Sequence, residues 1–116
     1  MRKIKVINGG LAVDERGSVR FVNDFTFEGV KRFYQVENNN IGFIRAWHGH
    51  MKESKYLYVA SGSALVGMVN LKNEEVNKVI LSWQTPKVLY IPAGHANGFM
   101  NLEKNTKIIF FSTSSL

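Results

Sequence analysis

The sequence predicts an all-β, single-domain protein built as an antiparallel sandwich or barrel. Its 116 residues are of the size of one domain, and 45% apolar with 21% charged residues is ordinary for a globular chain. Apolar residues alternate with polar ones over short segments, and turn residues separate these segments roughly every 8–12 positions. No segment keeps a helical apolar period over about ten residues, which argues against helical bundles and α/β folds.

The predicted strands follow from this alternation, one after another along the chain. They are nine segments: 3–7, 18–22, 32–36, 41–47, 56–60, 64–71, 79–83, 88–91 and 107–112. Asn8–Gly10 and Asp14–Gly17 are turns, and Ser61–Ser63 predicts a hairpin between its two flanking strands. Residues 24–30 are the one stretch with room for a helical turn. The polar stretch 92–98 predicts a tight turn in which Gly94 and Gly98 allow a ligand to approach the backbone.

The charge balance points to an anionic small molecule. The chain carries 15 Lys and Arg against 9 Asp and Glu, a net charge of +6. Basic and acidic residues alternate without a basic run, so we expect a phosphorylated compound and no nucleic acid. We expect no membrane partner, because no apolar segment approaches the roughly 18 residues of a membrane-spanning helix. We also expect no signal peptide, because no apolar segment follows the basic residues at the N-terminus. The absence of cysteine excludes disulfide scaffolds and thiolate metal sites and fits the cytoplasm.

Side chains that could take part in catalysis or ligand binding concentrate in the stretch 42–50. His48 and His50 are two positions apart, so on a strand they point to the same face. Arg45 precedes His48 by three residues and can approach the same barrel mouth through a bulge or turn, and Asn97 comes from the second polar cluster.

Two spaced sets of residues resemble the two cupin motifs: Gly42, His48, His50, Lys55 and Gly62 for the first, and Pro92, Gly94, Asn97 and Asn101 for the second. In metal-binding cupins the first motif supplies two histidines and a glutamate, and the second supplies a histidine. Lys55 stands at the glutamate position, and Asn97 at that of the last histidine. A protonated lysine repels a divalent cation and cannot ligate it. The resemblance therefore implies a small jelly-roll barrel over residues 1–116, with no metal and no other cofactor.

Longer stretches are similar to two families of sugar-nucleotide enzymes. Residues 14–17, 31–34 and 45–52 are similar to motifs of dTDP-4-keto-6-deoxyglucose 3,4-ketoisomerases, and residues 89–99 to those of dTDP-4-dehydrorhamnose 3,5-epimerases. Both families act on a sugar with a ketone at C4, which acidifies the neighbouring C–H so that a base can form an enediolate. The resemblance implies a nucleotide-diphosphate sugar, expected to be dTDP-linked, and a role in deoxysugar biosynthesis.

The resemblance also implies residue roles. An imidazole suits the base, a fixed cation suits the oxyanion, and the planar fork of arginine suits a diphosphate. We expect His48 to be the main base and His50 a second base or relay. We expect Arg16 to reach the ligand, either in its own subunit or in a partner subunit. The expected site is His48, His50, Lys55 and Tyr34 as catalytic residues, and Arg16, Arg45 and Asn97 as substrate-binding residues.

Two departures from the epimerase pattern favour ketoisomerisation. Epimerases carry a tyrosine that acts as the general acid on the strand matching residues 107–113, where this chain has Phe110. They also carry a later aspartate that orients the histidine, whereas the only aspartates of this chain are Asp14 and Asp24. Epimerisation needs proton delivery to the opposite face of the sugar, while ketoisomerisation needs only one face and a relay. The alternatives are a 3,5-epimerase, a sugar-nucleotide-binding cupin without turnover, and a metal-dependent dioxygenase.

The N-terminal segment predicts an oligomeric state. Residues 2–7 alternate apolar and basic side chains, which is typical of an edge strand. Exposed edges are generally covered or paired, and pairing across a two-fold axis is common. We therefore expect a homodimer.

Overall fold

The computed structural model describes residues 3–115, and within this range the regular structure is entirely β. The eleven strands are β1 (Lys5–Asn8), β2 (Gly10–Asp14), β3 (Gly17–Phe21), β4 (Arg32–Glu37), β5 (Ile44–His50), β6 (Lys55–Ser61), β7 (Ser63–Asn70), β8 (Val76–Ser82), β9 (Lys87–Ile91), β10 (His95–Asn101) and β11 (Lys107–Ser112). The predicted all-β jelly-roll class is confirmed.

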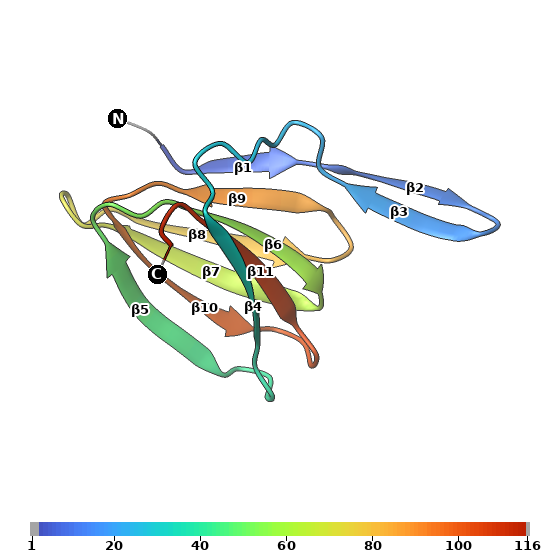
Figure 1. Cartoon of the computed structure of the whole chain (residues 1–116). Helices are drawn as coiled ribbons and strands as arrows, with labels where there is room; N and C mark the ends of the chain where they lie inside the picture. The colour runs from blue at the N-terminus through green and yellow to red at the C-terminus, as the bar shows by residue number, and fades with distance from the viewer. Residues whose placement is uncertain (1–2, 116) are drawn as a thin grey trace.

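Two antiparallel sheets face each other and form the body of the molecule (Figure 1). The first has the order β1-β9-β6-β11-β4, and the second has the order β5-β10-β7-β8. A third sheet consists of β2 and β3 alone, and this hairpin projects away from the body (Figure 1). Strands β4 and β5 are consecutive along the chain, yet each is an edge strand of a different sheet.

The core lies between the two facing sheets. On β6, Lys55, Leu57 and Val59 are buried, whereas Tyr56 and Tyr58 between them are only half-buried. This alternation follows from the two-residue period of a strand, and it points the Lys55 side chain inward with the apolar residues. The same face receives Phe110 from β11, and the opposite sheet supplies Phe99.

The predicted hairpin between residues 56–60 and 64–71 is wrong. Strand β6 pairs with β9 and β11, whereas β7 pairs with β8 and β10 in the other sheet. Gly62 lies between them with φ 76°, a left-handed conformation that glycine adopts at little cost. The turn therefore carries the chain from one sheet to the other instead of folding a strand back on its neighbour.

The prediction of a turn over residues 92–98 holds only at its start. Gly94 has φ 86°, but the strand β10 begins at His95 and runs through Gly98. A Cβ on Gly98 would lie 2.5 Å from the Cβ of Ala46. The close approach that this glycine permits is therefore that of the neighbouring strand β5, and His95 is a buried strand residue.

Two further expectations need correction. Strand β2 was absent from the predicted set, although residues 10–14 pair with β3 over their whole length. Residues 24–30 contain a turn and no helix. Between residues 3 and 115 there is no helical segment with the length and apolarity that a membrane crossing requires.

The N-terminal strand β1 lies at the edge of the five-stranded sheet, as expected, and pairs only with β9 there. Arg2, which belongs to the segment 2–7 expected to form this edge, lies outside the described residues. The homodimer built on this edge stays a prediction.

Candidate active site

The predicted catalytic side chains lie at the side of the sandwich where β4 and β5 are the edge strands of the two sheets. Tyr34 lies on β4, His48 and His50 on β5, and Lys55 at the start of β6. His48 is exposed and His50 is half-buried, whereas Lys55 is only 6% exposed. Solvent therefore reaches the histidines from outside while the ammonium lies within the protein.

The pairing of β5 with β10 places Asn97 at this site. Asn97 lies directly opposite His48, and His95 directly opposite His50. Residues opposite each other in an antiparallel pair share a face of the sheet. The Asn97 side chain is 2% exposed, so the structure brings this predicted sugar-binding amide next to the predicted base.

The structure adds Glu53, which the sequence analysis missed. It lies in the loop between β5 and β6, and its Oε1 is 3.0 Å from Nδ1 of His50. Its other oxygen, Oε2, accepts a short hydrogen bond from the Ser112 hydroxyl on β11. The sequence signal was a carboxylate three residues after His50, but only aspartates were considered as groups that orient a histidine.

The surroundings of His50 favour its neutral form. Burial, followed by the charge of Lys55, lowers the pKa of His50, and His48 lowers it further, while Glu53 opposes the shift. A histidine with a lowered pKa keeps a free nitrogen lone pair at pH values where an ordinary histidine begins to protonate.

Lys55 supplies a cation inside the sandwich. Its Nζ lies 5.6 Å from the centroid of the Phe110 ring, and no carboxylate among residues 3–115 lies within salt-bridge distance of it. Burial lowers the pKa of Lys55, Arg32 lowers it further, and Glu53 opposes both. A buried ammonium without a contacting carboxylate is suited to bind a negative charge that arises on a ligand.

Tyr34 keeps its proton in this setting. Burial and the nearby Glu53 raise the pKa of the Tyr34 phenol, and Arg32 opposes them. The Tyr34 ring is stacked on Phe110, and the two residues lie directly opposite each other on β4 and β11. The phenol is therefore protonated at neutral pH and held in a fixed ring plane.

Arg32 is the second site residue that the sequence analysis did not single out. It lies two positions before Tyr34 on β4, and its guanidinium is 4.6 Å from the centroid of the Tyr34 ring. Its Nε is buried and has no hydrogen-bond partner within the described part of the chain. The signal was present, because residues two apart on a strand share a face.

Arg45 is held in place by a small amide network. Its Nε donates to Oδ1 of Asn38 at 2.5 Å, and Nδ2 of Asn38 donates to Oδ1 of Asn101 at 3.1 Å. Asn101 is 1% exposed and also donates to the Asn38 carbonyl. Arg45 itself is exposed, three residues before His48 on β5, and the network holds its guanidinium against the segment between β4 and β5.

Arg16 lies apart from these residues. It is 84% exposed in the turn between β2 and β3, where it forms an ion pair with Asp14 at 2.6 Å. The hairpin projects away from the body, so within one protomer Arg16 does not join the site. Its contribution to the site of a partner subunit stays a prediction.

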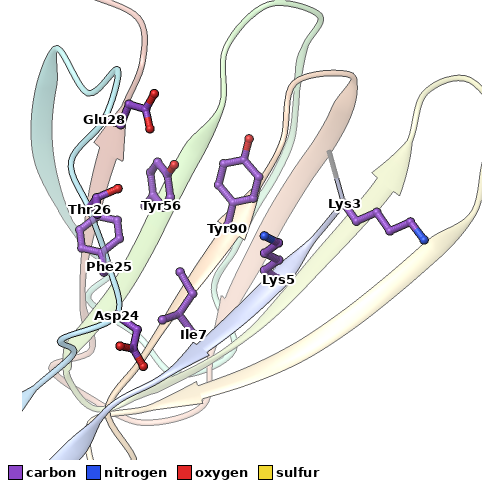
Figure 2. A pocket seen from close by; sticks show the side chains of 9 residues that line it. All are labelled: Lys3, Lys5, Ile7, Asp24, Phe25, Thr26, Glu28, Tyr56 and Tyr90. Atoms are coloured by element: carbon purple, nitrogen blue, oxygen red, sulfur yellow. The ribbon is translucent and has the colours of Figure 1, made fainter. Parts of the chain in front are cut away.

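A cavity of about 500 Å³ lies elsewhere. Tyr56, Tyr90, Phe25 and Lys5 line it, and none of the predicted site residues does (Figure 2). Tyr56 follows Lys55 on β6 and so points to the opposite face of the sheet. This hollow is on the outer face of the five-stranded sheet, separate from the histidines. In residues 3–115 no group of three or more His, Asp or Glu could hold a metal ion, and the absence of a metal stays a prediction.

A family model described as dTDP-4-dehydrorhamnose 3,5-epimerase matches residues 2–115. The chain belongs to this family. Its members are sugar-nucleotide enzymes, in agreement with the resemblance inferred from the motifs. A comparison with curated proteins gave no match.

Solved structures share the fold at low sequence identity. The rmlC epimerase of Mycobacterium tuberculosis has a TM-score of 0.83 and 21% identity, over 97% of this chain and 64% of that one. The WlaRB TDP-quinovose 3,4-ketoisomerase of Campylobacter jejuni has a TM-score of 0.79 and 24% identity, over 100% and 88%. The 3'-monoepimerase ChmJ of Streptomyces bikiniensis, in complex with dTDP-quinovose, has a TM-score of 0.84 and 16% identity, over 97% and 65%. The chain thus spans somewhat less than two thirds of the two epimerases and most of the ketoisomerase.

Proposed function

We propose that the chain isomerises a nucleotide-linked 4-keto-6-deoxyhexose by removing a proton next to the ketone, and that 3,4-ketoisomerisation is its reaction. The observation that carries this proposal is the juxtaposition of two imidazoles, a protonated phenol and a buried ammonium at one edge of the sandwich. Such a set provides a base, a proton donor and a cation for an oxyanion. Family membership supports the substrate class, and ChmJ in complex with dTDP-quinovose supports a dTDP-linked ligand.

The first step forms an enediolate. His48 removes the proton from C3, the electron pair forms the C3–C4 double bond, and the negative charge moves to O4. Lys55 and Arg32 offset that charge, because Arg32 lies over the Tyr34 ring and Lys55 lies near the Phe110 ring on which Tyr34 stacks. General base catalysis contributes roughly 10²–10⁴-fold, and preorganised stabilisation of an oxyanion a comparable factor.

The second step moves the carbonyl. Tyr34 donates a proton to O4, and the O3 hydroxyl proton is taken up through the relay of Tyr34 and His50. His48 then returns its proton to C4. The product has a ketone at C3 and a hydroxyl at C4, so protons and electrons balance, and the site regains its starting state without a cofactor.

The remaining predicted residues bind the substrate. Arg45 contacts the diphosphate through its guanidinium, and Asn97 donates to a sugar hydroxyl next to His48. In the proposed homodimer, the projecting hairpin carries Arg16 towards the partner's ligand. The projecting hairpin (Figure 1) and the edge position of β1 support this arrangement.

Epimerisation at C3 and C5 is the second candidate, and a specific observation favours it. Phe110 stands where the epimerase pattern has its acidic tyrosine, but Tyr34 lies directly opposite Phe110 on β4. A phenol is therefore present in the same layer of the interior, supplied by the neighbouring strand. The description of the matching family supports this reading as well.

Proton exchange distinguishes these reactions. The protein is incubated with dTDP-4-keto-6-deoxyglucose in heavy water, and the ring protons are followed by NMR. We expect deuterium at C3 of the substrate and at C4 of a new 3-keto product. Exchange at C3 and C5 without carbonyl migration would establish the epimerase instead. Saturable binding without any exchange would leave only a sugar-nucleotide-binding protein and would contradict both reactions.

A further inference from the structure

Glu53 faces the interior of the site from the loop between β5 and β6. Its side chain is only 10% exposed, and each of its two oxygens has one partner: Nδ1 of His50 and the hydroxyl of Ser112. Ser112 is fully buried on β11, the strand that also carries Phe110. The carboxylate therefore links the loop after β5 to the opposite sheet through one histidine and one serine.

A carboxylate on one imidazole nitrogen determines which nitrogen carries the proton. An ionised glutamate only accepts hydrogen bonds, so the Nδ1 of His50 must be the donor, and the Nε2 of the neutral ring then holds the lone pair. We propose that Glu53 is a positioning residue that fixes His50 in the Nδ1–H form, leaving Nε2 as a proton acceptor for the isomerisation. This proposal rests on the proposed function for its role in turnover.

The distribution of charge argues that this contact is more than a neutralising ion pair. Glu53 is near enough to Lys55 to raise its pKa, yet no salt bridge joins them among the described residues. The carboxylate contacts His50 instead. A group that served only to neutralise the buried cation would be expected to contact it directly.

The groups around His50 define what Glu53 does to its titration. Lys55 and His48 lower the pKa of His50, and Glu53 is the group that raises it. His95 lies opposite His50 on β10, and its own Nδ1 lies 3.1 Å from the Pro92 carbonyl oxygen. Removing the charge of Glu53 therefore leaves His50 facing cations, and the pKa of His50 must fall.

The test uses NMR of the imidazole nitrogens in the ¹⁵N-labelled full chain without substrate. In the wild type we expect His50 to show a protonated Nδ1 and a bare Nε2. Glu53→Gln keeps the shape and an acceptor oxygen but removes the charge, so the midpoint of the His50 titration should fall to lower pH. Glu37→Gln is the matched control, because Glu37 is exposed on β4, and it should leave the His50 titration unchanged.

Steady-state kinetics tests whether the contact between Glu53 and His50 matters for turnover. In Glu53→Gln we expect kcat to fall about 10–100-fold, the size of effect seen when a group that orients a metal-binding histidine is lost, with a smaller change in KM. Ser112→Ala should cause a weaker loss of the same kind. A His50 protonated at Nε2 in the wild type, or an unmoved titration in Glu53→Gln, would overturn the positioning role. If the NMR result holds while no isomerisation is found, the proposed function fails and the role of Glu53 in setting the tautomer stands.

Discussion

The rings of Tyr34 and Phe110 lie parallel, 5.0 Å apart between centroids and within 3° of each other. The two residues are direct cross-strand partners on β4 and β11. A phenylalanine on one strand thus forms the flat support for a phenol on the next. The support fixes the plane of the ring that would donate a proton in the proposed reaction.

Tyr34→Phe should abolish most turnover and leave the fold intact. The variant keeps the stacked ring and loses only the hydroxyl, so we expect kcat to fall by roughly 10²–10⁴-fold, the range for loss of general acid catalysis. Thermal unfolding should shift little. Tyr58→Phe is the control, since Tyr58 points to the opposite face of the five-stranded sheet. A Tyr34→Phe variant with wild-type turnover would remove the phenol from the mechanism.

Lys55→Met should separate activity from stability. The ammonium is needed only when negative charge develops, so we expect a larger loss in kcat than rise in KM. The same change removes a buried cation that contacts no carboxylate in residues 3–115, so the melting temperature should stay equal or rise. A large fall in both melting temperature and activity would indicate that Lys55 serves the fold.

The pH dependence of stability gives an independent check on Lys55. The pKa of Lys55 is lower in the folded chain, so the folded state binds fewer protons than the unfolded state as pH approaches the ordinary value of 10.5. The free energy of unfolding contributed by this group therefore rises with pH between the folded and the unfolded pKa values. Denaturant unfolding at several alkaline pH values should show this rise in the wild type and lose it in Lys55→Met.

The alternation of residues predicted the parts of the fold and site that depend on strand direction alone. The two-residue period identified most strands and placed His48 and His50 on a common face. The inward position of Lys55 was expected only from the resemblance to the first cupin motif, because the predicted strand 56–60 began one residue after it. Strand β10 was missed because its polar and glycine residues look like a turn, and only its burial between β5 and β7 makes it a strand.

The rest of the site depends on contacts between distant segments. Glu53 lies in a loop, and its contact with Ser112 joins residues 59 positions apart. The contact of Asn38 with Asn101 spans 63 positions. The sequence carries no local signal for such pairs. The switch of sheets at Gly62 is equally invisible, since a glycine between two alternating segments also suits a hairpin.

His48→Asn and His50→Asn should distinguish the two candidate reactions. Loss of the main base at His48 should cost roughly 10²–10⁴-fold in kcat and leave nucleotide binding nearly intact. A ketoisomerase that uses both imidazoles should lose most activity in His50→Asn, whereas an epimerase that depends on His48 should lose little. Initial rates with dTDP-4-keto-6-deoxyglucose and calorimetric binding of dTDP measure the two effects. If His48→Asn retains full turnover, His48 is not the base.

The acid side of the pH–rate profile should report the charge of Lys55. The base must be neutral, and the pKa of His50 is lowered by burial and by Lys55, so activity that depends on His50 should persist below the ordinary value of 6.5. Removing the cation in Lys55→Met raises the pKa of His50, and the acid limb of the residual activity should move to higher pH. The profile of kcat/KM against pH measures this shift. An unchanged limb would show that His50 does not control the rate.

Arg45→Ala should weaken nucleotide binding more than turnover at saturation. The guanidinium is exposed at the rim of the site, and the amide network of Asn38 and Asn101 fixes its direction. We expect dTDP to bind several-fold more weakly, with the larger loss at low salt, where attraction between charges is least screened. Lys104→Ala is the control for net charge, because Lys104 is an exposed cation 59 residues after Arg45 in the sequence.

Asn38→Ala retains the positive charge of Arg45 but removes the hydrogen bond that holds the Arg45 side chain. It should therefore weaken dTDP binding less than Arg45→Ala does, with a similar dependence on salt. Equal binding by Arg45→Ala and Lys104→Ala would show that Arg45 contributes only to the general charge of the surface.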